Sequence, residues 1–230
     1  MQLTLLDKIP ETEDVWTFRF KPESPLTWQA GQFLIYSLSH KNEDVRGKMR
    51  FFTISSAPFE KNPSITTRIN TEKGSSFKKA LMNLKQGDTM SAKGPDGHFV
   101  IDDPKKNYVF LAGGIGITPF YSILKEFNHT HSTAKEGPIN ITLLYSNKSG
   151  LIPLKEELDE ITNNLEGLEI IYLTERIDKE IIKENVSGLH SPIFYISGPE
   201  PMVEALSSTL KETGALPENI REDFFPGYET

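Results

Sequence analysis

The sequence predicts two domains, an N-terminal antiparallel β-barrel and a C-terminal α/β domain built on a parallel sheet. Short strands separated by turns fill the N-terminal part of the chain, with one helical stretch among them. Strands and helices then alternate toward the C-terminus. The pattern changes after Asp102-Asp103-Pro104, so we place the domains at residues 1–103 and 104–230.

The first domain is expected to consist of short strands and one helix. Alternation of apolar and polar side chains predicts half-buried strands over residues 15–20, 32–38, 50–55 and 65–69. Phe77, Leu81 and Leu84 recur at helical spacing, and Gly87-Asp88 ends that helix. Short strands punctuated by turns in this way are typical of a small antiparallel barrel.

The second domain is expected to repeat a strand-helix unit. The apolar patterns predict strands over residues 108–112, 139–145, 168–174 and 193–197, and helices over 119–127, 153–165, 178–185 and 201–212. This repeat implies a parallel sheet with helices on both faces. We interpret the polar stretch 128–138 as a peripheral connection.

The composition argues against several classes of protein. The formal net charge of −7 disfavours nucleic acid or an anionic membrane as the main partner. The sequence contains no run of about 18 apolar residues, so we expect no membrane-spanning helix. The lack of cysteine excludes thiol catalysis and a cysteine-ligated iron–sulfur cluster within this chain. The histidines lack the spacing of metal ligands, so we expect no metal site. The first residues lack the pattern of a signal peptide, so we expect a cytoplasmic location.

A glycine-rich turn follows the apolar strand Val109–Ala112. Three glycines occur within four residues: Gly113, Gly114 and Gly116. Thr118 is suited to cap the next helix and Pro119 to begin it, so free amides and a positive helix end would face one spot that suits a phosphate. The alternative is a tight connection without a ligand. Because the pattern Gly-Gly-x-Gly-x-Thr-Pro differs from the usual dinucleotide fingerprint, a plain Rossmann dehydrogenase is disfavoured.

The strand that begins Arg50-Phe51-Phe52-Thr53 is the second informative stretch. Alternation places Arg50 and Phe52 on one face and Phe51 and Thr53 on the other. An arginine, an aromatic ring and a hydroxyl this close together are able to grip a phosphate, stack on a ring and bond a ring nitrogen. An ordinary barrel strand with an exposed arginine explains the segment equally well.

Taken together and in order, these motifs resemble the ferredoxin–NADP reductase-like flavoproteins along essentially the whole chain. Arg50 to Thr53 is similar to the family's Arg-x-Tyr-Ser/Thr flavin motif. The resemblance implies that Arg50 binds the FAD diphosphate, that Phe52 packs on the isoalloxazine, and that Thr53 meets its N5 edge. Gly74-Ser75-Ser76 resembles the second diphosphate clamp, although a capped helix start is the alternative.

The resemblance also assigns a nicotinamide-nucleotide site to the second domain. The turn from Gly113 to Pro119 is similar to the family's nucleotide loop, with Thr118 near the pyrophosphate. Ser197-Gly198-Pro199-Glu200-Pro201-Met202 resembles its Cys/Ser-Gly-Pro-x-x-Met turn. Gly198 would lie beside the nicotinamide, and Ser197, Pro199 and Met202 complete the candidate set. An ordinary strand-to-helix turn is the alternative reading of this segment.

Two further segments bear on the nucleotide and on its access to the flavin. Thr174 and Glu175 stand where NADP-preferring relatives place serine and arginine, so the resemblance favours NADH, with NADPH left open by the nearby Arg176. At the end of the chain, the resemblance makes Phe224 the aromatic that covers the flavin and Glu222 the acid near the site. The alternative is a last strand with Phe224 as a core anchor.

The predicted function is an FAD-dependent reductase. NADH, or NADPH, would pass a hydride to FAD, and electrons would leave to a separate acceptor such as a ferredoxin or another redox protein. Thr53, Ser197, Glu222 and Phe224 are the candidate catalytic residues. The alternatives are a reductase of free flavin or ferric iron, a non-catalytic flavin-bearing subunit, and a nucleotide-binding module without flavin.

Overall fold

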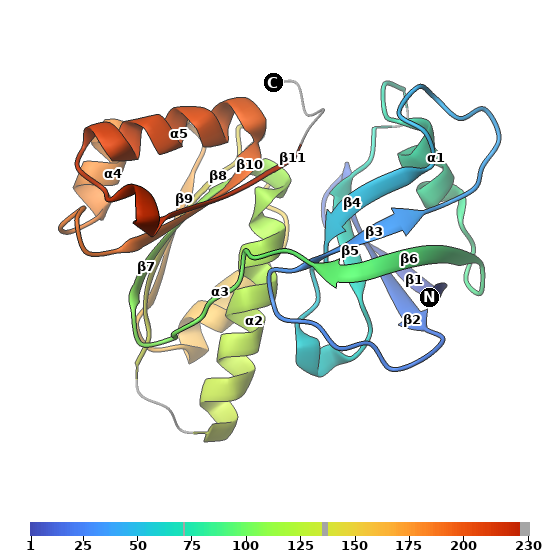
Figure 1. Ribbon diagram of the computed structural model, residues 1–230, viewed down its shortest axis with the longest axis horizontal. Helices are drawn as coiled ribbons and strands as arrows, with labels where there is room; N and C mark the ends of the chain where they lie inside the picture. Colours follow the sequence, from blue (N-terminus) through green and yellow to red (C-terminus); the bar gives the residue numbers. More distant parts are fainter. Residues whose placement is uncertain (71, 135–137, 226–230) are drawn as a thin grey trace. The chain divides into compact units, whose positions relative to one another are not determined.

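The computed structural model describes residues 1–70, 72–134 and 138–225 (Figure 1). The tail beyond residue 225, part of the predicted aromatic terminus, lies outside the described residues. The chain forms two compact units, Met1–Val100 and Ile101–Thr230, which are described separately below.

The first unit is a six-stranded antiparallel sheet that closes almost completely into a barrel, as predicted. Its strands are β1 (Gln2–Pro10), β2 (Val15–Pro22), β3 (Phe33–Ser37), β4 (Met49–Thr53), β5 (Ser64–Arg68) and β6 (Thr89–Asp96). Their order is β4-β3-β6-β1-β2-β5, so β4 and β5 are the two edges. The chain leaving β4 reaches the other edge, because the Ser55 amide donates to the Ser64 carbonyl over 3.0 Å.

The core of the barrel consists of aromatic and aliphatic side chains that alternate inward along the strands. Phe18, Phe20, Leu34 and Tyr36 are all fully buried, and each such apolar side chain contributes about 1.5–3 kcal/mol. The short helix α1 (Ser76–Asn83) adds Phe77 and Leu81 to the same core. Its start is capped by the side chain of Ser75, which accepts the Lys78 amide.

The second unit is a five-stranded parallel sheet with helices on both faces, as predicted. The strands are β7 (Asn107–Gly113), β8 (Asn140–Ser146), β9 (Leu168–Leu173), β10 (Ile193–Pro199) and β11 (Ile220–Phe225), in the order β11-β10-β7-β8-β9. The helices are α2 (Ile117–Ala134), α3 (Lys155–Asn164), α4 (Lys179–Asn185) and α5 (Glu200–Glu212). Figure 1 shows α4 and α5 on one face of the sheet and α2 and α3 on the other.

Alternation along the central strand explains how both faces are filled. Val109 and Leu111 of β7 face α4 and α5, whose Ile182 and Leu206 belong to the same core cluster. Phe110 faces the opposite way and stacks on Phe120 of α2 with ring centroids 4.6 Å apart. A central parallel strand buried on both sides therefore accounts for the uninterrupted apolar run in the sequence.

The structure differs from the sequence prediction in part, and it decides one open alternative. Helix α2 continues through residue 134, so much of the stretch 128–138 that was expected to be a loop is helical. Strands β1 and β6 were not predicted. The C-terminal segment forms β11, a last strand that runs parallel to β10, but Phe224 is 49% exposed and is not the core anchor of that alternative.

Candidate cofactor-binding sites

Strand β4 presents two aromatic side chains in different environments. Phe52 pairs with Leu34 across the strands and is half-buried against Tyr36 and Phe77, at centroid distances of 5.9 and 5.8 Å. Phe51 points to the other face and is 63% exposed, beside Phe33 at 5.5 Å. Thr53 shares the face of Phe51 and is buried. The ring with open surface is therefore Phe51, although the sequence motif singled out Phe52.

Arg50 lies at the start of β4 with its guanidinium largely covered. Nη1 donates to the carbonyls of Arg46, Gly47 and Met49 over 2.7, 3.0 and 2.6 Å, and Cζ lies 5.5 Å from the centre of the Phe77 ring. Nη2 is buried and finds no hydrogen-bond acceptor among the described residues, although Asp44 Oδ1 is 3.5 Å away. Burial lowers the pKa of Arg50, partly offset by Asp44. A buried cationic donor without an acceptor suits a phosphate oxygen.

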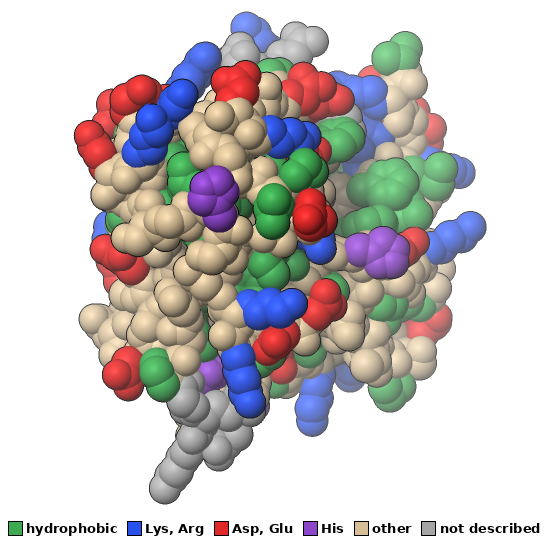
Figure 2. All heavy atoms as spheres, turned by 60° about the vertical axis from the view of Figure 1, so that its left-hand side comes forward, with side chains coloured by type: hydrophobic (Ala, Val, Ile, Leu, Met, Phe, Trp, Pro, Cys, Tyr) green, Lys and Arg blue, Asp and Glu red, His purple; other side chains and the backbone are tan. Residues whose placement is uncertain are grey.

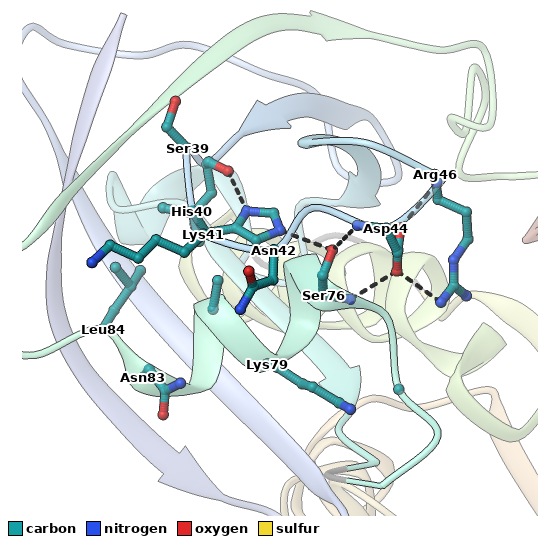
Figure 3. Close-up of a pocket in the computed structure, with 13 residues that line it drawn as sticks. Ser39, His40, Lys41, Asn42, Asp44, Arg46, Ser76, Lys79, Asn83 and Leu84 are labelled. Carbon is teal, nitrogen blue, oxygen red and sulfur yellow. Dashed lines mark hydrogen bonds and ion pairs between the residues drawn. The ribbon is translucent and has the colours of Figure 1, made fainter.

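The start of α1 faces Asp44, the same residue that Arg50 approaches. The backbone amide of Ser76 donates to Asp44 Oδ2 over 2.8 Å, and the Arg46 guanidinium donates to the same oxygen over 2.9 Å (Figure 3). The Ser76 hydroxyl accepts the Asp44 amide at 2.9 Å and lies 2.8 Å from His40 Nε2. The Ser76 amide bond, followed by the Arg46 bonds, lowers the pKa of Asp44 to about 2.

A cavity of about 720 Å³ lies between the β3–β4 loop and α1. Figure 3 shows residues of both segments turned toward it, among them His40, Lys79 and Asn83. Gly74 is needed here for a local reason, because an added Cβ would lie 2.1 Å from the Asn70 carbonyl oxygen. The turn before α1 therefore requires glycine even before a ligand is considered.

The glycine turn of the second unit connects β7 to α2 through the 3₁₀ turn Gly114–Gly116. A Cβ added at Gly113 would lie 2.1 Å from Met202 Sδ, and one at Gly116 would lie 2.2 Å from the Ser197 carbonyl oxygen. Gly114 has a φ of +54° and open space around its Cα. The glycines thus let two predicted motifs pack against each other and leave one peptide open to a ligand.

The glycine turn lies at the position in the sheet where open α/β proteins commonly bind ligands. The chain passes from β7 to β8 and β9 on one side, and then returns to β10 on the other side of β7. Ligands of open α/β sheets bind at the carboxyl ends of the strands where the order reverses in this way. Gly113 is the last residue of β7, and Ser197, which pairs with Ala112, lies near the end of β10.

The start of α2 differs from the prediction. The helix begins at Ile117, so Thr118 is not its N-cap and Pro119 is its third residue. The Thr118 hydroxyl is buried and donates to the Ile115 carbonyl over 3.2 Å. Proline is tolerated at this position because the first-turn amides of a helix have no partner within it.

Ser197 is fully buried, and its hydroxyl donates to Asp223 Oδ2 over 3.3 Å. Burial raises the pKa of Asp223 to about 6, and the bond from Ser197 opposes this rise. Glu222 points elsewhere and accepts a short hydrogen bond from Ser207 of α5. The acid that reaches Ser197 is therefore Asp223, which the sequence analysis missed. Strand pairing gives the reason, because β11 places Asp223 opposite Ser197.

The remaining predicted residues lie at the carboxyl end of the same sheet. Thr174 and Glu175 are exposed just after β9, and the Ser146 hydroxyl fixes this turn by donating to the Glu175 carbonyl over 2.5 Å. Phe224 is 49% exposed and pairs in register with Gly198. Gly198 and Pro199 form the end of β10, and Met202 lies in the first turn of α5.

Known proteins share both halves of this arrangement. Residues 2–101 match the family model described as an oxidoreductase FAD-binding domain, and residues 110–208 match the oxidoreductase NAD-binding domain. The chain belongs to the ferredoxin–NADP reductase-like flavoproteins. Membership in this flavoprotein family confirms the predicted FAD and nicotinamide cofactors.

The relatives of this flavoprotein include subunits of larger systems. The glycine betaine monooxygenase reductase subunit of Pseudomonas aeruginosa is 32% identical over 94% of this chain and 62% of its own length. Flavohemoprotein A of Dictyostelium discoideum is 27% identical over 95% of this chain and 58% of its own length. The chain therefore spans about six tenths of the length of the curated relatives it matches.

Solved structures share the fold of the flavoprotein over nearly its whole length. The cytochrome b5 reductase domain of Ulva prolifera nitrate reductase has a TM-score of 0.80 at 24% identity, with 96% of each chain covered. The ferredoxin-NADP+ reductase of Plasmodium falciparum has a TM-score of 0.78 at 18% identity, covering 97% of this chain and 95% of the other. At these identities the likeness establishes the shared architecture.

Two general features of the flavoprotein complete the description. Acidic and basic side chains are interspersed over the face seen in Figure 2, in a chain whose formal net charge is −7. Within residues 1–70, 72–134 and 138–225, no helix is long and apolar enough to cross a membrane. Over the same residues, no group of three acidic or histidine side chains is arranged to hold a metal ion.

Proposed function

We propose that this chain is an FAD-dependent NAD(P)H oxidoreductase that passes electrons to a separate acceptor. The observation that carries the proposal is the presence, in one chain, of two anion-binding arrangements at the starts of helices. One consists of Arg50 and the α1 terminus, and the other is the glycine turn between β7 and α2. FAD, when bound, supplies the hydride and electron chemistry, and the protein supplies binding and alignment.

In the first unit, Arg50 and the segment Gly74 to Ser76 hold the flavin diphosphate. The Nη2 of Arg50 and the Ser76 amide, both of which now face the Asp44 carboxylate, are the donors that support this assignment. Thr53 lies at the reactive edge of the flavin. Because Phe51 shares the face of Thr53 and is exposed, we assign the contact with the ring system to Phe51, while Phe52 supports the strand from the core side.

In the second unit, the glycine turn and the β10–α5 turn hold the nicotinamide dinucleotide. The residues assigned to it are Gly113, Gly114, Gly116, Thr118, Pro119, Gly198, Pro199 and Met202. Ser197 positions the nicotinamide, and its hydroxyl is oriented by Asp223, so Asp223 takes the place that the family resemblance gave to Glu222. Phe224 is exposed and pairs with Gly198, next to Asp223. An aromatic side chain that moves aside when the nucleotide binds has to be exposed in this way.

We propose NADH as the preferred donor. Glu175 is exposed after β9, where a carboxylate accepts hydrogen bonds from ribose hydroxyls and repels a 2′-phosphate. The acceptor is a separate redox protein, such as a ferredoxin or the oxygenase of a multicomponent system. The names of two relatives support this, a glycine betaine monooxygenase reductase subunit and a 2-halobenzoate 1,2-dioxygenase electron transfer component. The cytoplasmic location stays a prediction.

A reductase that uses flavin as a diffusing substrate is the second candidate. The observation that favours it is the internal pairing of Arg46 and Ser76 with Asp44, which FAD has to compete with. Flavin retention separates the two candidates. We expect the chain, after incubation with FAD and gel filtration, to stay yellow, and the released flavin to be identified as FAD by chromatography.

Titration of the yellow protein with NADH and NADPH then tests the reductase itself. We expect NADH to reduce the bound flavin at a lower concentration than NADPH does. A protein that takes up no flavin from excess FAD contradicts the proposal. Rapid loss of flavin on the column, with reduction of free flavin by NADH, would favour the second candidate.

A further inference from the structure

The carboxylate of Asp44 occupies the centre of the proposed diphosphate clamp. It receives the Ser76 amide at 2.8 Å and the Arg46 guanidinium at 2.9 Å, and it forms an ion pair with Arg50 at 3.5 Å. Figure 3 shows Asp44 turned toward Ser76 and Arg46 at one end of the cavity. Hydrogen bonds from Ser76 and Arg46 and the ion pair with Arg50 therefore converge on one anionic group of the chain itself.

This carboxylate uses the donors that a phosphate would need. The first amides of a helix have no intrahelical partner, and they bind anions for that reason. The Ser76 amide is one of these, and Asp44 satisfies it. The Asp44 carboxylate is ionised at neutral pH, with its pKa lowered further by the bond from the Ser76 amide, so it carries the same sign of charge as a phosphate.

Asp44 and a diphosphate cannot both use this amide. Two anionic groups within contact distance repel each other, and one N–H makes one good hydrogen bond. Resting on the function proposed above, we propose that Asp44 is an internal competitor for the flavin. Its carboxylate stands in for a phosphate in the flavin-free chain, and FAD binds by displacing it together with the loop that carries it.

The loop between β3 and β4 is suited to such a displacement. Val45 is fully exposed beside Asp44, and Gly47 has a φ of +66° with no atom within 4 Å of an added Cβ. The loop is attached to α1 through polar contacts at Ser76, by the Asp44 amide and by His40. Since the cavity is lined by this loop and by α1, a ligand that reaches Ser76 through it meets Asp44.

The test is the affinity for FAD of the Asp44→Asn variant, measured from the change in flavin fluorescence on binding. Asparagine keeps the size of the side chain and an oxygen for the Ser76 amide, but it removes the charge. We expect FAD to bind roughly tenfold more tightly than to the wild type. Inorganic pyrophosphate, used as a competitor of FAD, is expected to gain affinity in the same direction.

The matched control is Asp7→Asn, which removes an ion pair between Asp7 and Arg19 in the same unit without touching the clamp. It is expected to leave FAD affinity unchanged. If the wild type binds FAD and the Asp44→Asn variant binds it equally or more weakly, the inference is overturned. Asp44 would then be a residue that supports Arg50. A wild type that binds no FAD overturns the proposed function, and the inference with it.

Hydrogen exchange on the wild type provides a test that needs no variant. The Asp44 amide is held by the Ser76 hydroxyl in the flavin-free chain. Displacement of the loop predicts faster exchange in peptides covering residues 39–47 after FAD is added. Slower exchange in these peptides would show that the flavin fixes the loop in place, and it would overturn the inference.

Discussion

The two regions proposed to bind the cofactor phosphates are built in opposite ways. The clamp proposed in the barrel relies on the charge of Arg50 beside the Ser76 amide, and the Asp44 carboxylate already pairs with both. The turn in the second unit consists of backbone and glycine, and its neighbours leave no room for a Cβ at Gly113 or Gly116. The first site is thus sensitive to charge and the second to volume. A ligand has to compete with a side chain at the first and only has to fit at the second.

Gly116→Ala is expected to have the largest effect and tests the sensitivity to volume. The added Cβ would meet the Ser197 carbonyl oxygen at 2.2 Å, so the β10–α5 turn has to shift. A shift of this size is expected to slow reduction of the bound flavin by NADH roughly a hundredfold. The measurement is stopped-flow reduction under anaerobic conditions.

The control for this substitution is Gly150→Ala. Gly150, unlike Gly116, has a positive φ, of +71°, and nothing lies within 4 Å of an added Cβ. It is expected to cost a small amount of stability through backbone strain and to leave the reduction rate unchanged. Equal rates for Gly116→Ala and the wild type would show that the turn does not position the nucleotide.

Arg50→Ala tests the sensitivity to charge in the barrel. Loss of a charge-assisted bond to phosphate is expected to weaken FAD binding about 30-fold, or about 2 kcal/mol. At saturating FAD, the rate of reduction by NADH should stay close to that of the wild type. Arg68→Ala, which removes an exposed ion pair with Asp14, is the control. An unchanged FAD affinity in Arg50→Ala would remove Arg50 from the site.

Asp223→Asn tests whether a buried charge also matters at the second site. The folded-state pKa of Asp223 is raised from 3.8 to about 6. The folded chain therefore holds this proton more tightly than the unfolded chain. Wild-type stability is largest, as far as this group contributes, below pH 3.8 and falls as the pH rises through about 6.

Because asparagine does not titrate, the Asp223→Asn variant should gain about 2–3 kcal/mol over the wild type above that range. The two proteins should converge in acid. Urea unfolding across this pH range makes the measurement. A stability difference that is independent of pH would show that the Asp223 carboxylate is not buried in this way.

Glu175→Arg is expected to have the smallest effect, because Glu175 is exposed and its charge is screened. The ratio of kcat/KM for NADPH to that for NADH should rise roughly tenfold. Arg176→Gln, at the neighbouring exposed position, is the matched comparison. If only Arg176→Gln changes the ratio, the register assumed at this turn is wrong by one residue.

The sequence predicted what depends on local pattern and missed what depends on pairing across the fold. The apolar run Val109–Ala112 and the glycines after it determine their own conformation, so the strand and turn were predicted correctly. Asp223 could be assigned to Ser197 only once β11 was known to pair with β10. Asp44 contacts Ser76 at a sequence separation of 32 residues, a distance over which periodicity carries no information.

Errors at the ends of elements have similar causes. Thr118 has the residue type of an N-cap, but the 3₁₀ turn before it already begins the helix at Ile117. Strand β6, with the sequence Thr-Met-Ser-Ala-Lys-Gly-Pro-Asp, has too few apolar side chains to stand out. Its place between β3 and β1 stabilises it as a strand. Tertiary contacts therefore override weak local preference at these positions.

The central claim is that one chain binds both coenzymes so that a hydride passes between them. The most direct measurement is mixing of FAD-loaded wild-type protein with NADH in the absence of oxygen, followed through the yellow flavin absorbance. We predict rapid bleaching of the bound flavin that saturates with NADH. Bound flavin that stays yellow at saturating NADH and NADPH would contradict the claim.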